Sequence, residues 1–225
     1  MRAARVWVEK VDSPSDSSKS VSPKEVALKL KLDYSRGVKD HATRHLEEVC
    51  ELCMKLEQPR FDADSFIKEA ADLILKLFGI ESVAVCLKDR SDGLYRYRYV
   101  VGIEKEIAEG FKGLTYTRAQ LLEDKTYPSH EISSRTRLFL SEEHPYAQGE
   151  EFTYRRPGLI GMKRRTLSDS LEADYLDFFF YGPDGDILGF IETSGTRLRK
   201  LPDIATIRWI ELIAFLLGVA VRRAT

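Results

Sequence analysis

Residues 174–192 of the 225-residue chain read DYLDFFFYGPDGDILGFIE, and this stretch decides the fold. Two runs rich in aromatic and β-branched residues flank a Gly-Pro-Asp-Gly turn, which predicts a β-hairpin. A four-residue loop places Tyr181 opposite Asp186. In that register Tyr175 stands opposite Glu192, and successive side chains point to opposite faces.

The two faces of this hairpin differ in character. The apolar face suits packing against helices and carries Leu176, Phe178, Phe180, Ile187, Gly189 and Ile191. The other face is aromatic with two carboxylates and carries Tyr175, Asp177, Phe179, Tyr181, Leu188, Phe190 and Glu192. We interpret this second face as the wall of a ligand pocket. The alternative is structural: the two carboxylates pair with Arg96 or Arg98, or reach solvent.

Periodicity in the rest of the chain predicts an α+β fold. Helical spacing covers residues 38–58, 62–79 and 202–221. Apolar or alternating runs predict strands at 82–88, 94–103 and 113–118. Residues 119–172 have weak periodicity, and a structureless loop of that length does not suit a compact domain. We therefore expect short elements there that cover the pocket as a lid.

The first and last of these helices are apolar on two sides. A heptad seam, with spacings that alternate between four and three residues, runs through Val38, Ala42, His45, Val49, Leu52 and Leu56. A second apolar row flanks it, and the helix at 202–221 also has two apolar stripes. A helix with two apolar rows needs two partners, so we predict a homodimer through the terminal helices.

The N-terminal part differs in composition from the rest. Residues 12–23 are rich in serine, with proline and aspartate between, and cannot bury enough apolar surface to order themselves. We assign residues 1–36 to a tail with a linker and a short helix, capped by Ser22 with Pro23 as its first residue. Residues 37–225 then form one domain.

The hairpin, with its Ile-Leu-Gly-Phe-Ile run, and the closing helix after Leu201-Pro202 resemble the GAF domain family of small-molecule sensor domains. Upstream, Phe66–Phe78 and Val83–Lys88 look like that family's helix entering its first strand. The resemblance covers residues 38–223. It implies a GAF-like antiparallel sheet of about six strands, N- and C-terminal helices on one face, a lidded cavity on the other, and frequent dimerisation through those helices.

Departures from the family's patterns narrow the ligands that the resemblance implies. The Asn-Lys-Phe-Asp-Glu signature of members that bind cyclic nucleotides is absent, because the chain has no asparagine. No Asp-Pro-x-x-His motif marks a bilin site. Free methionine sulfoxide reductases that look like this fold need cysteines near the cavity lid, and residues 119–172 have none. We assign no cofactor.

A basic stretch lies within the expected lid. It holds five cations and no acid between residues 152 and 168. Guanidinium groups suit bidentate binding of carboxylate or phosphate, which favours an anionic or aromatic ligand. The ligand-binding residues predicted from this stretch and from the hairpin are Arg135, Arg137, Tyr154, Arg155, Arg156, Tyr175, Asp177 and Glu192. The alternative is a solvated or ion-paired surface.

The three cysteines form no recognisable site. Cys50 and Cys53 make a Cys-x-x-Cys pair inside a predicted helix, where packing is the expected role and redox or metal chemistry the alternative. Cys86 lies mid-strand as a small buried side chain. His41 and His45 are one helical turn apart, but the cysteines lie around the helix from them. We predict no metal site, and no motif of a catalytic site is present.

Composition bounds the compartment and the partners. The chain has 35 Lys plus Arg against 36 Asp plus Glu, which argues against a nucleic-acid partner. Its longest apolar run, Leu212–Val221, is too short for a membrane span, and no signal peptide precedes the domain, so we expect a cytoplasmic protein. The lack of asparagine and the 32% charged residues suggest a thermophilic source, with genomic base composition as the alternative.

These observations predict a non-catalytic sensory or regulatory domain. It would bind an unidentified small ligand beneath residues 119–172 and signal through its dimer helices. Since we find no output segment in residues 38–223, we expect that it acts on a separate output protein or is a piece of a longer protein. Two alternatives stay open. One is a redox enzyme of the free methionine sulfoxide reductase type, and the other is a purely structural dimerisation module.

Overall fold

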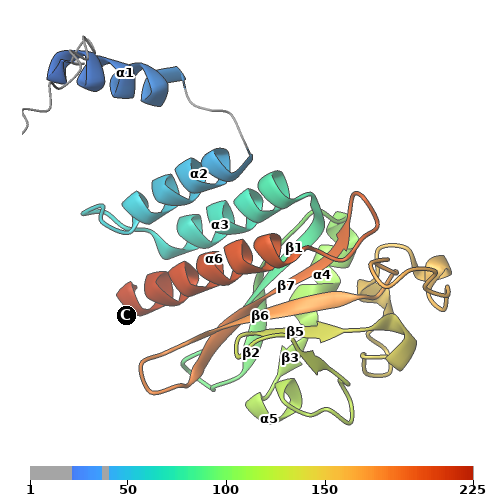
Figure 1. Cartoon of the computed structure of the whole chain (residues 1–225). Coiled ribbons are helices and arrows are strands. Elements are labelled where there is room, and N and C mark those ends of the chain that lie inside the picture. Colours follow the sequence, from blue (N-terminus) through green and yellow to red (C-terminus); the bar gives the residue numbers. More distant parts are fainter. Residues whose placement is uncertain (1–21, 37–40, 225) are drawn as a thin grey trace, which may run out of the picture. The chain divides into compact units, whose positions relative to one another are not determined.

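The computed structural model describes residues 22–36 and 41–224 (Figure 1). The chain divides into two units between Arg44 and His45. The first unit contains α1 (Pro23–Arg36), which begins with the predicted cap: Ser22 Oγ accepts a hydrogen bond from Glu25 N at 3.2 Å. Ser22 N in turn donates to the Glu25 carboxylate at 2.8 Å. The tail at residues 1–21 and the expected helix start at Val38 lie outside the described residues.

The second unit is built on one antiparallel sheet, which confirms the α+β class. Its strands lie in the order β3-β2-β1-β7-β6-β5-β4, each antiparallel to its neighbours. The strands are β1 (Ile80–Lys88), β2 (Tyr95–Val101), β3 (Thr115–Tyr116), β4 (His130–Glu131), β5 (Thr136–Phe139), β6 (Tyr175–Tyr181) and β7 (Ile187–Thr196).

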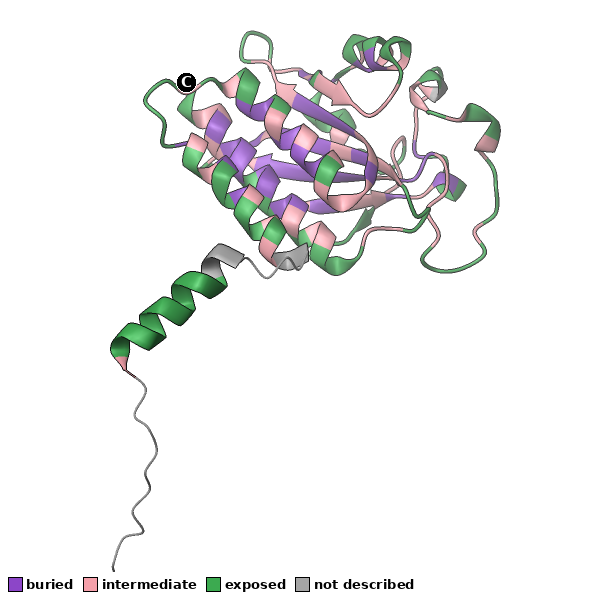
Figure 2. Ribbon diagram, turned by 90° about the horizontal axis from the view of Figure 1, so that it is seen from above, coloured by how far each residue is buried: buried purple, intermediate pink, exposed green. Residues whose placement is uncertain are grey.

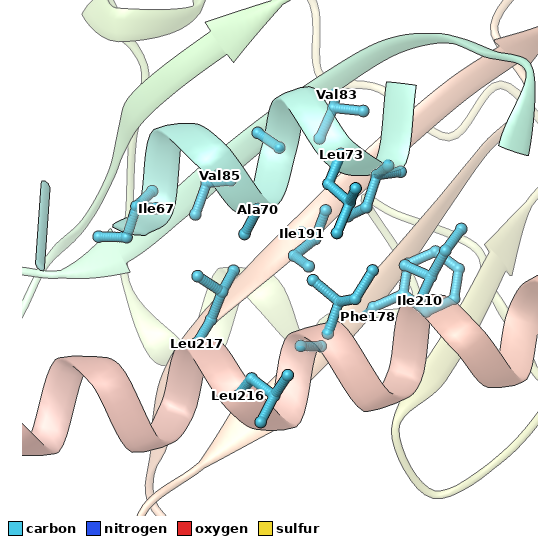
Figure 3. Close-up of a cluster of buried hydrophobic side chains, with 14 of the residues drawn as sticks. Ile67, Ala70, Leu73, Val83, Val85, Phe178, Ile191, Ile210, Leu216 and Leu217 are labelled. Carbon is cyan, nitrogen blue, oxygen red and sulfur yellow. The ribbon is translucent and has the colours of Figure 1, made fainter. Parts of the chain in front are cut away.

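The helices α3 (Ala63–Phe78) and α6 (Ile204–Arg223) cover one face of this sheet (Figure 1). The helix α2 (His41–Lys55) packs on these two helices through His45, which contacts Phe78 and Trp209. Their inner sides are buried and their outer sides exposed (Figure 2). Figure 3 shows the core between α3, α6 and the sheet, where Phe178, Ile191 and Leu217 have no exposed surface. This arrangement confirms helices on one face and leaves the other face for a second layer.

Local signals fix where the helices begin and end. The Asp62 carboxylate caps α3 by accepting from Asp64 N at 3.1 Å, and Gly79 ends that helix in the left-handed conformation with φ of 63°. Asp203 caps α6 by accepting from Thr206 N at 2.7 Å. These ends agree with the predictions from the sequence.

The hairpin register differs from the prediction by two residues. Asp177 pairs directly with Glu192, where the expected register paired it with Phe190, and Tyr175 pairs with Ser194. The cause is a wider turn, closed by a hydrogen bond from Gly182 N to Asp186 O at 2.8 Å, with an irregularity at the end of β6. A shift of two residues keeps most side chains on their predicted faces.

Two side chains next to this turn exchange faces. Ile187 packs on the pocket side with Phe179, and Leu188 packs against the helix-side core, the reverse of the prediction. The irregular pairing of Tyr181 with Ile187 rotates the start of β7 by one residue. At Gly189 the backbone of β1 approaches closely, since a Cβ there would lie 2.3 Å from Cys86 O.

One helix was not predicted from the sequence. The strand expected at 94–103 ends at Val101, which leaves room for this helix before β3. The helix α4 (Lys105–Gly113) follows this strand and carries Ala108 and Phe111 into the second layer. The strand expected at 113–118 shortens to β3. The remaining helices are the short α5 (Arg118–Leu121) and the 3-10 turns η1 (Ser141–Glu143), η2 (Glu151–Thr153) and η3 (Pro157–Leu159).

Among the described residues, α6 is the one helix long and apolar enough to cross a membrane. The prediction from uninterrupted apolar runs overlooked it, because charged residues divide its sequence. In the structure its inner stripe is core: Ile210, Ile213 and Leu217 are fully buried against the sheet and α3. A core helix of a globular domain also has one buried and one partly exposed side. The length and apolar composition of α6 therefore do not by themselves indicate a membrane span.

Candidate functional site

A small cavity lies on the sheet face opposite α2, α3 and α6. The segment from 119 to 172, which we call the lid, lies over it with α5, β4, β5 and the 3-10 turns. The volume of the cavity is about 60 Å³. Its lining comprises Tyr97, Phe111, Leu114, Tyr116, Leu121, Tyr127, Phe139, Pro145, Tyr146, Glu150, Thr153, Tyr154, Tyr175, Asp177, Phe190 and Glu192.

Two carboxylates stand side by side on the floor of the cavity. Asp177 of β6 and Glu192 of β7 are directly opposite each other in the strand pairing. Asp177 is 6% exposed, and its Oδ1 is buried without a hydrogen-bond partner among the described residues. Glu192 accepts a hydrogen bond from the Tyr97 hydroxyl of β2. One carboxylate is therefore satisfied by the protein, and the other is not.

A third carboxylate, that of Glu150, enters the cavity from the lid. Its Oε1 accepts from the Tyr127 hydroxyl at 3.0 Å and, at a longer 3.4 Å, from that of Tyr116. Its Oε2 accepts from the backbone N of Ala147 at 2.9 Å. The bond from Tyr116 joins the lid to β3, and the other two hold Glu150 within the lid.

The paired carboxylates have raised pKa values. Burial, followed by the neighbouring Glu192, raises the pKa of Asp177 well above its usual value, and Arg137 opposes that rise. Burial raises the pKa of Glu192 to about 7, although the hydrogen bond from Tyr97 works in the other direction. Glu150 adds to the rise at Glu192. The pair therefore holds protons at pH values where exposed carboxylates have lost theirs.

The rest of the lining is dominated by aromatic rings. Phe139 stacks on Tyr175 with ring centres 4.3 Å apart, and Tyr97 meets Phe111 edge to face at 5.0 Å. The Tyr175 hydroxyl donates to Pro145 O of the lid at 2.6 Å. Burial raises the pKa of both tyrosines above the usual value, so they remain neutral donors.

Four of the eight predicted ligand-binding residues line this cavity: Tyr154, Tyr175, Asp177 and Glu192. The alternative was that Asp177 and Glu192 pair with Arg96 or Arg98. Arg96 instead pairs with Asp92 at 2.6 Å. Sequence reasoning missed Tyr97, Tyr116, Tyr127 and Glu150. The alternation of tyrosines along residues 95–99 was the available signal for the first of these.

The predicted basic residues of the lid lie beside the cavity and form ion pairs. Arg155 pairs with Glu81 at 3.1 Å, and Arg156 pairs with Glu81 at 3.2 Å and with Glu172 at 2.8 Å. Both arginines line an adjacent hollow that shares Tyr154 with the main cavity. Here the stretch serves to fasten the lid, in line with the ion-paired alternative.

The two other predicted arginines lie at the end of the sheet. The Arg135 guanidinium lies 5.7 Å from the centre of the Tyr181 ring, and that of Arg137 lies 6.0 Å from the centre of the Phe179 ring. Arg137 also approaches Asp124 at 3.7 Å. Neither residue contributes to the cavity lining.

Among the described residues, no cysteine or histidine lines the cavity either. Cys50 is exposed on α2, Cys53 packs against the helix-side core, and Cys86 is buried in β1. His45 packs edge to face on Phe78 with ring centres 4.9 Å apart. Within residues 22–36 and 41–224 no cluster of His, Cys, Asp or Glu could hold a metal ion. The side chain of His41 lies outside the described set.

The antiparallel sheet, the helix layer on one face and the lidded cavity on the other define an α+β domain built around a ligand-sized space. No family model and no curated protein matches the chain, but solved structures do. The GAF domain of Nlh2 from A. aeolicus, in an inactive state, aligns with a TM-score of 0.54 and 13% identity, covering 83% of this chain and 100% of that one.

Two further solved structures support the same assignment. The GAF domain of a phosphoenolpyruvate-protein phosphotransferase from Acinetobacter aligns with a TM-score of 0.52 and 10% identity, covering 80% of this chain and 93% of that one. Residues 122 to 287 of a methyl-accepting chemotaxis protein align with a TM-score of 0.51 and 13% identity, covering 76% and 95%. The chain therefore has a GAF-like fold, as the resemblance of its C-terminal hairpin implies.

Proposed function

We propose that this chain is a non-catalytic sensory or regulatory domain that binds a small organic ligand in the lidded cavity. The similar structures come from proteins such as a chemotaxis protein and a phosphotransferase, which supports a regulatory role. The largely aromatic lining with a few polar groups has the character of a ligand site. We also propose that the domain works in the cytoplasm on a separate output protein.

The observation that carries this proposal is a chain of contacts from the cavity to α6. Phe139 of β5 lines the cavity and stacks on Tyr175. At the other end of the same short strand, Thr136 donates from its hydroxyl to Glu211 of α6 at 2.8 Å. The neighbouring Ser133 hydroxyl donates to the same carboxylate oxygen.

Glu211 is buried among the helices, with 8% of its surface exposed, and also accepts from Arg208 at 2.9 Å. The hydrogen bonds to it from the β4–β5 connection join the lid to the opposite layer of the domain. A ligand that displaces Phe139 would move a strand that is fastened to α6. This is a contiguous physical path of the kind that can couple two sites.

We propose that α6 and α2 pass the change on to a second copy of the chain. Their outer sides carry apolar residues that the domain leaves exposed: Leu46 (54%), Met54 (62%), Leu212 (40%) and Phe215 (47%). These positions continue the double apolar rows of the two helices. A parallel helix bundle between two copies would bury them.

Native mass spectrometry of the full chain as purified tests both parts, because it weighs the assembly and any bound organic molecule. We expect a dimer with a small ligand retained. The double change Leu212→Glu with Phe215→Glu should give a monomer, while Leu198→Glu, at a loop residue 84% exposed, should not. A monomeric wild type would refute dimer signalling, and absence of any bound or stabilising small molecule would refute the sensor role.

A further inference from the structure

The cavity combines a buried carboxylate with aromatic walls, and this combination indicates which class of ligand it binds. Asp177 lines a space walled by aromatic rings, and its Oδ1 is buried without a hydrogen-bond partner among the described residues. A buried acceptor without a partner costs free energy. Because Asp177 also lines the cavity, a ligand bound there can supply the donor that the protein lacks.

We propose that the ligand is a small organic ammonium ion, which donates N–H hydrogen bonds to Asp177 Oδ1 and lays its carbon chain against the aromatic rings. This inference rests on the proposed function, since it names the class of molecule that the same cavity binds.

The charges around the cavity favour a cation. Three carboxylates line it, those of Asp177, Glu192 and Glu150, and the described lining contains no Lys, Arg or His. The nearest positive group in the strand pairing is Arg137, opposite Asp177, but it forms its ion pair with Asp124. Once the pair has lost its protons, an anionic ligand would face three carboxylates at short range in a low-dielectric space.

The aromatic walls favour the same class of ligand. Nine of the lining residues are aromatic: Tyr97, Phe111, Tyr116, Tyr127, Phe139, Tyr146, Tyr154, Tyr175 and Phe190. The face of an aromatic ring attracts a cation, most strongly where water is excluded. The rings also bury the carbon atoms of the ligand. A carboxylate between aromatic rings therefore recognises both ends of an alkylammonium ion.

Size and geometry distinguish an organic cation from a metal ion. No group of three carboxylate, imidazole or thiolate side chains in the described residues converges closely enough to hold a metal. One water molecule needs roughly 10 to 15 Å³ of such space, so about 60 Å³ accommodates a group of about four to six heavy atoms. n-Butylamine, with its single ammonium group, has this size.

Three probes of matched shape test the inference: n-butylamine, n-butanol and butyrate, which carry positive, zero and negative charge at neutral pH. Calorimetric titration and thermal unfolding of the full chain measure their binding. We expect n-butylamine to bind most tightly and to raise the melting temperature. In Asp177→Asn its affinity should fall on the order of tenfold to a hundredfold, because a charge-assisted hydrogen bond is lost.

Asp184→Asn is the matched control, since Asp184 is exposed in the turn of the same hairpin. It removes one carboxylate from the molecule and should leave n-butylamine binding unchanged. Glu192→Gln gives a second test within the cavity, with a smaller expected loss because Tyr97 already satisfies that group. Circular dichroism confirms that each variant is folded.

Equal or tighter binding of butanol or butyrate would overturn the cation inference and leave the sensor role standing. The same holds if the purified protein retains a neutral or anionic molecule in native mass spectrometry. Failure of all three probes to bind would overturn the inference as well. The sensor role itself falls only if the protein as purified also carries no organic molecule.

Discussion

The pH dependence of stability offers a direct test of the buried carboxylate pair. Glu192 has a pKa of about 7 in the folded chain against an ordinary value of 4.5, so it holds a proton that the unfolded chain releases between these two pH values. Its contribution to stability is fully present below pH 4.5 and is lost as the pH rises through 7. The difference between these two pKa values corresponds to roughly 3 kcal/mol of unfolding free energy.

Glu192→Gln removes this titration while keeping an acceptor for the Tyr97 hydroxyl. Its unfolding free energy should therefore depend less steeply on pH, and above pH 7 the variant should be more stable than the wild type. Urea unfolding from about pH 5 to about pH 8 measures the difference. Asp177→Asn should act in the same direction.

Other titratable and charged groups near the pair also influence its pKa values. Those that act on Glu192 or Asp177 are Tyr97 of β2, Glu150 of the lid, Arg137 of β5, Cys86 of β1 and Tyr175 of β6. Carboxylates with lowered pKa values, such as Asp92 at about 2, affect stability only at lower pH. The surface change Glu57→Gln should leave the slope as it is. Parallel pH profiles of wild type and Glu192→Gln would refute the reasoning.

Three further predictions concern the rest of the fold. Gly189→Ala should lower the unfolding free energy by about 1 to 3 kcal/mol in urea titration, because the new Cβ would lie 2.3 Å from a backbone oxygen of β1. Arg164→Ala should cost about 3 kcal/mol, since it leaves the buried Asp174 carboxylate without its ion pair at 2.8 Å, whereas Lys200→Ala at an exposed pair should cost under about 1 kcal/mol. If the source is thermophilic, calorimetry should give a melting temperature above the mesophile range of about 45 to 65 °C.

The fold could be predicted where local chemistry decides it. Asp62, Gly79 and Asp203 mark helix ends through side-chain caps or a left-handed glycine, which depend on neighbouring residues alone. The faces of β6 and β7 followed from alternation. The register did not, because one irregular pairing beside the turn sets it, and the direct contact of Asp177 with Glu192 emerged only in the structure.

The site was harder to predict because its parts come from distant segments. Arg155 and Arg156 looked like an anion site in a run without acids, yet their partner Glu81 lies at the start of β1. Glu150 comes from the lid, where periodicity is weak. Gly110 of α4 also contacts a distant segment. A Cβ there would lie 2.4 Å from the ring of Phe152 in the lid, and no sequence pattern predicts this contact.

The raised pKa values also bear on how a bound cation would act. A neutral Asp177 gives up its proton when an ammonium ion takes the same place, so one positive charge replaces another and the cavity's net charge hardly changes. Binding should then strengthen as the pH rises through the pKa of the pair. Electrostatic repulsion would then contribute little to the proposed signal. The signal would come from the volume of the ligand pressing on Phe139, the residue whose strand is hydrogen-bonded to α6 through Glu211.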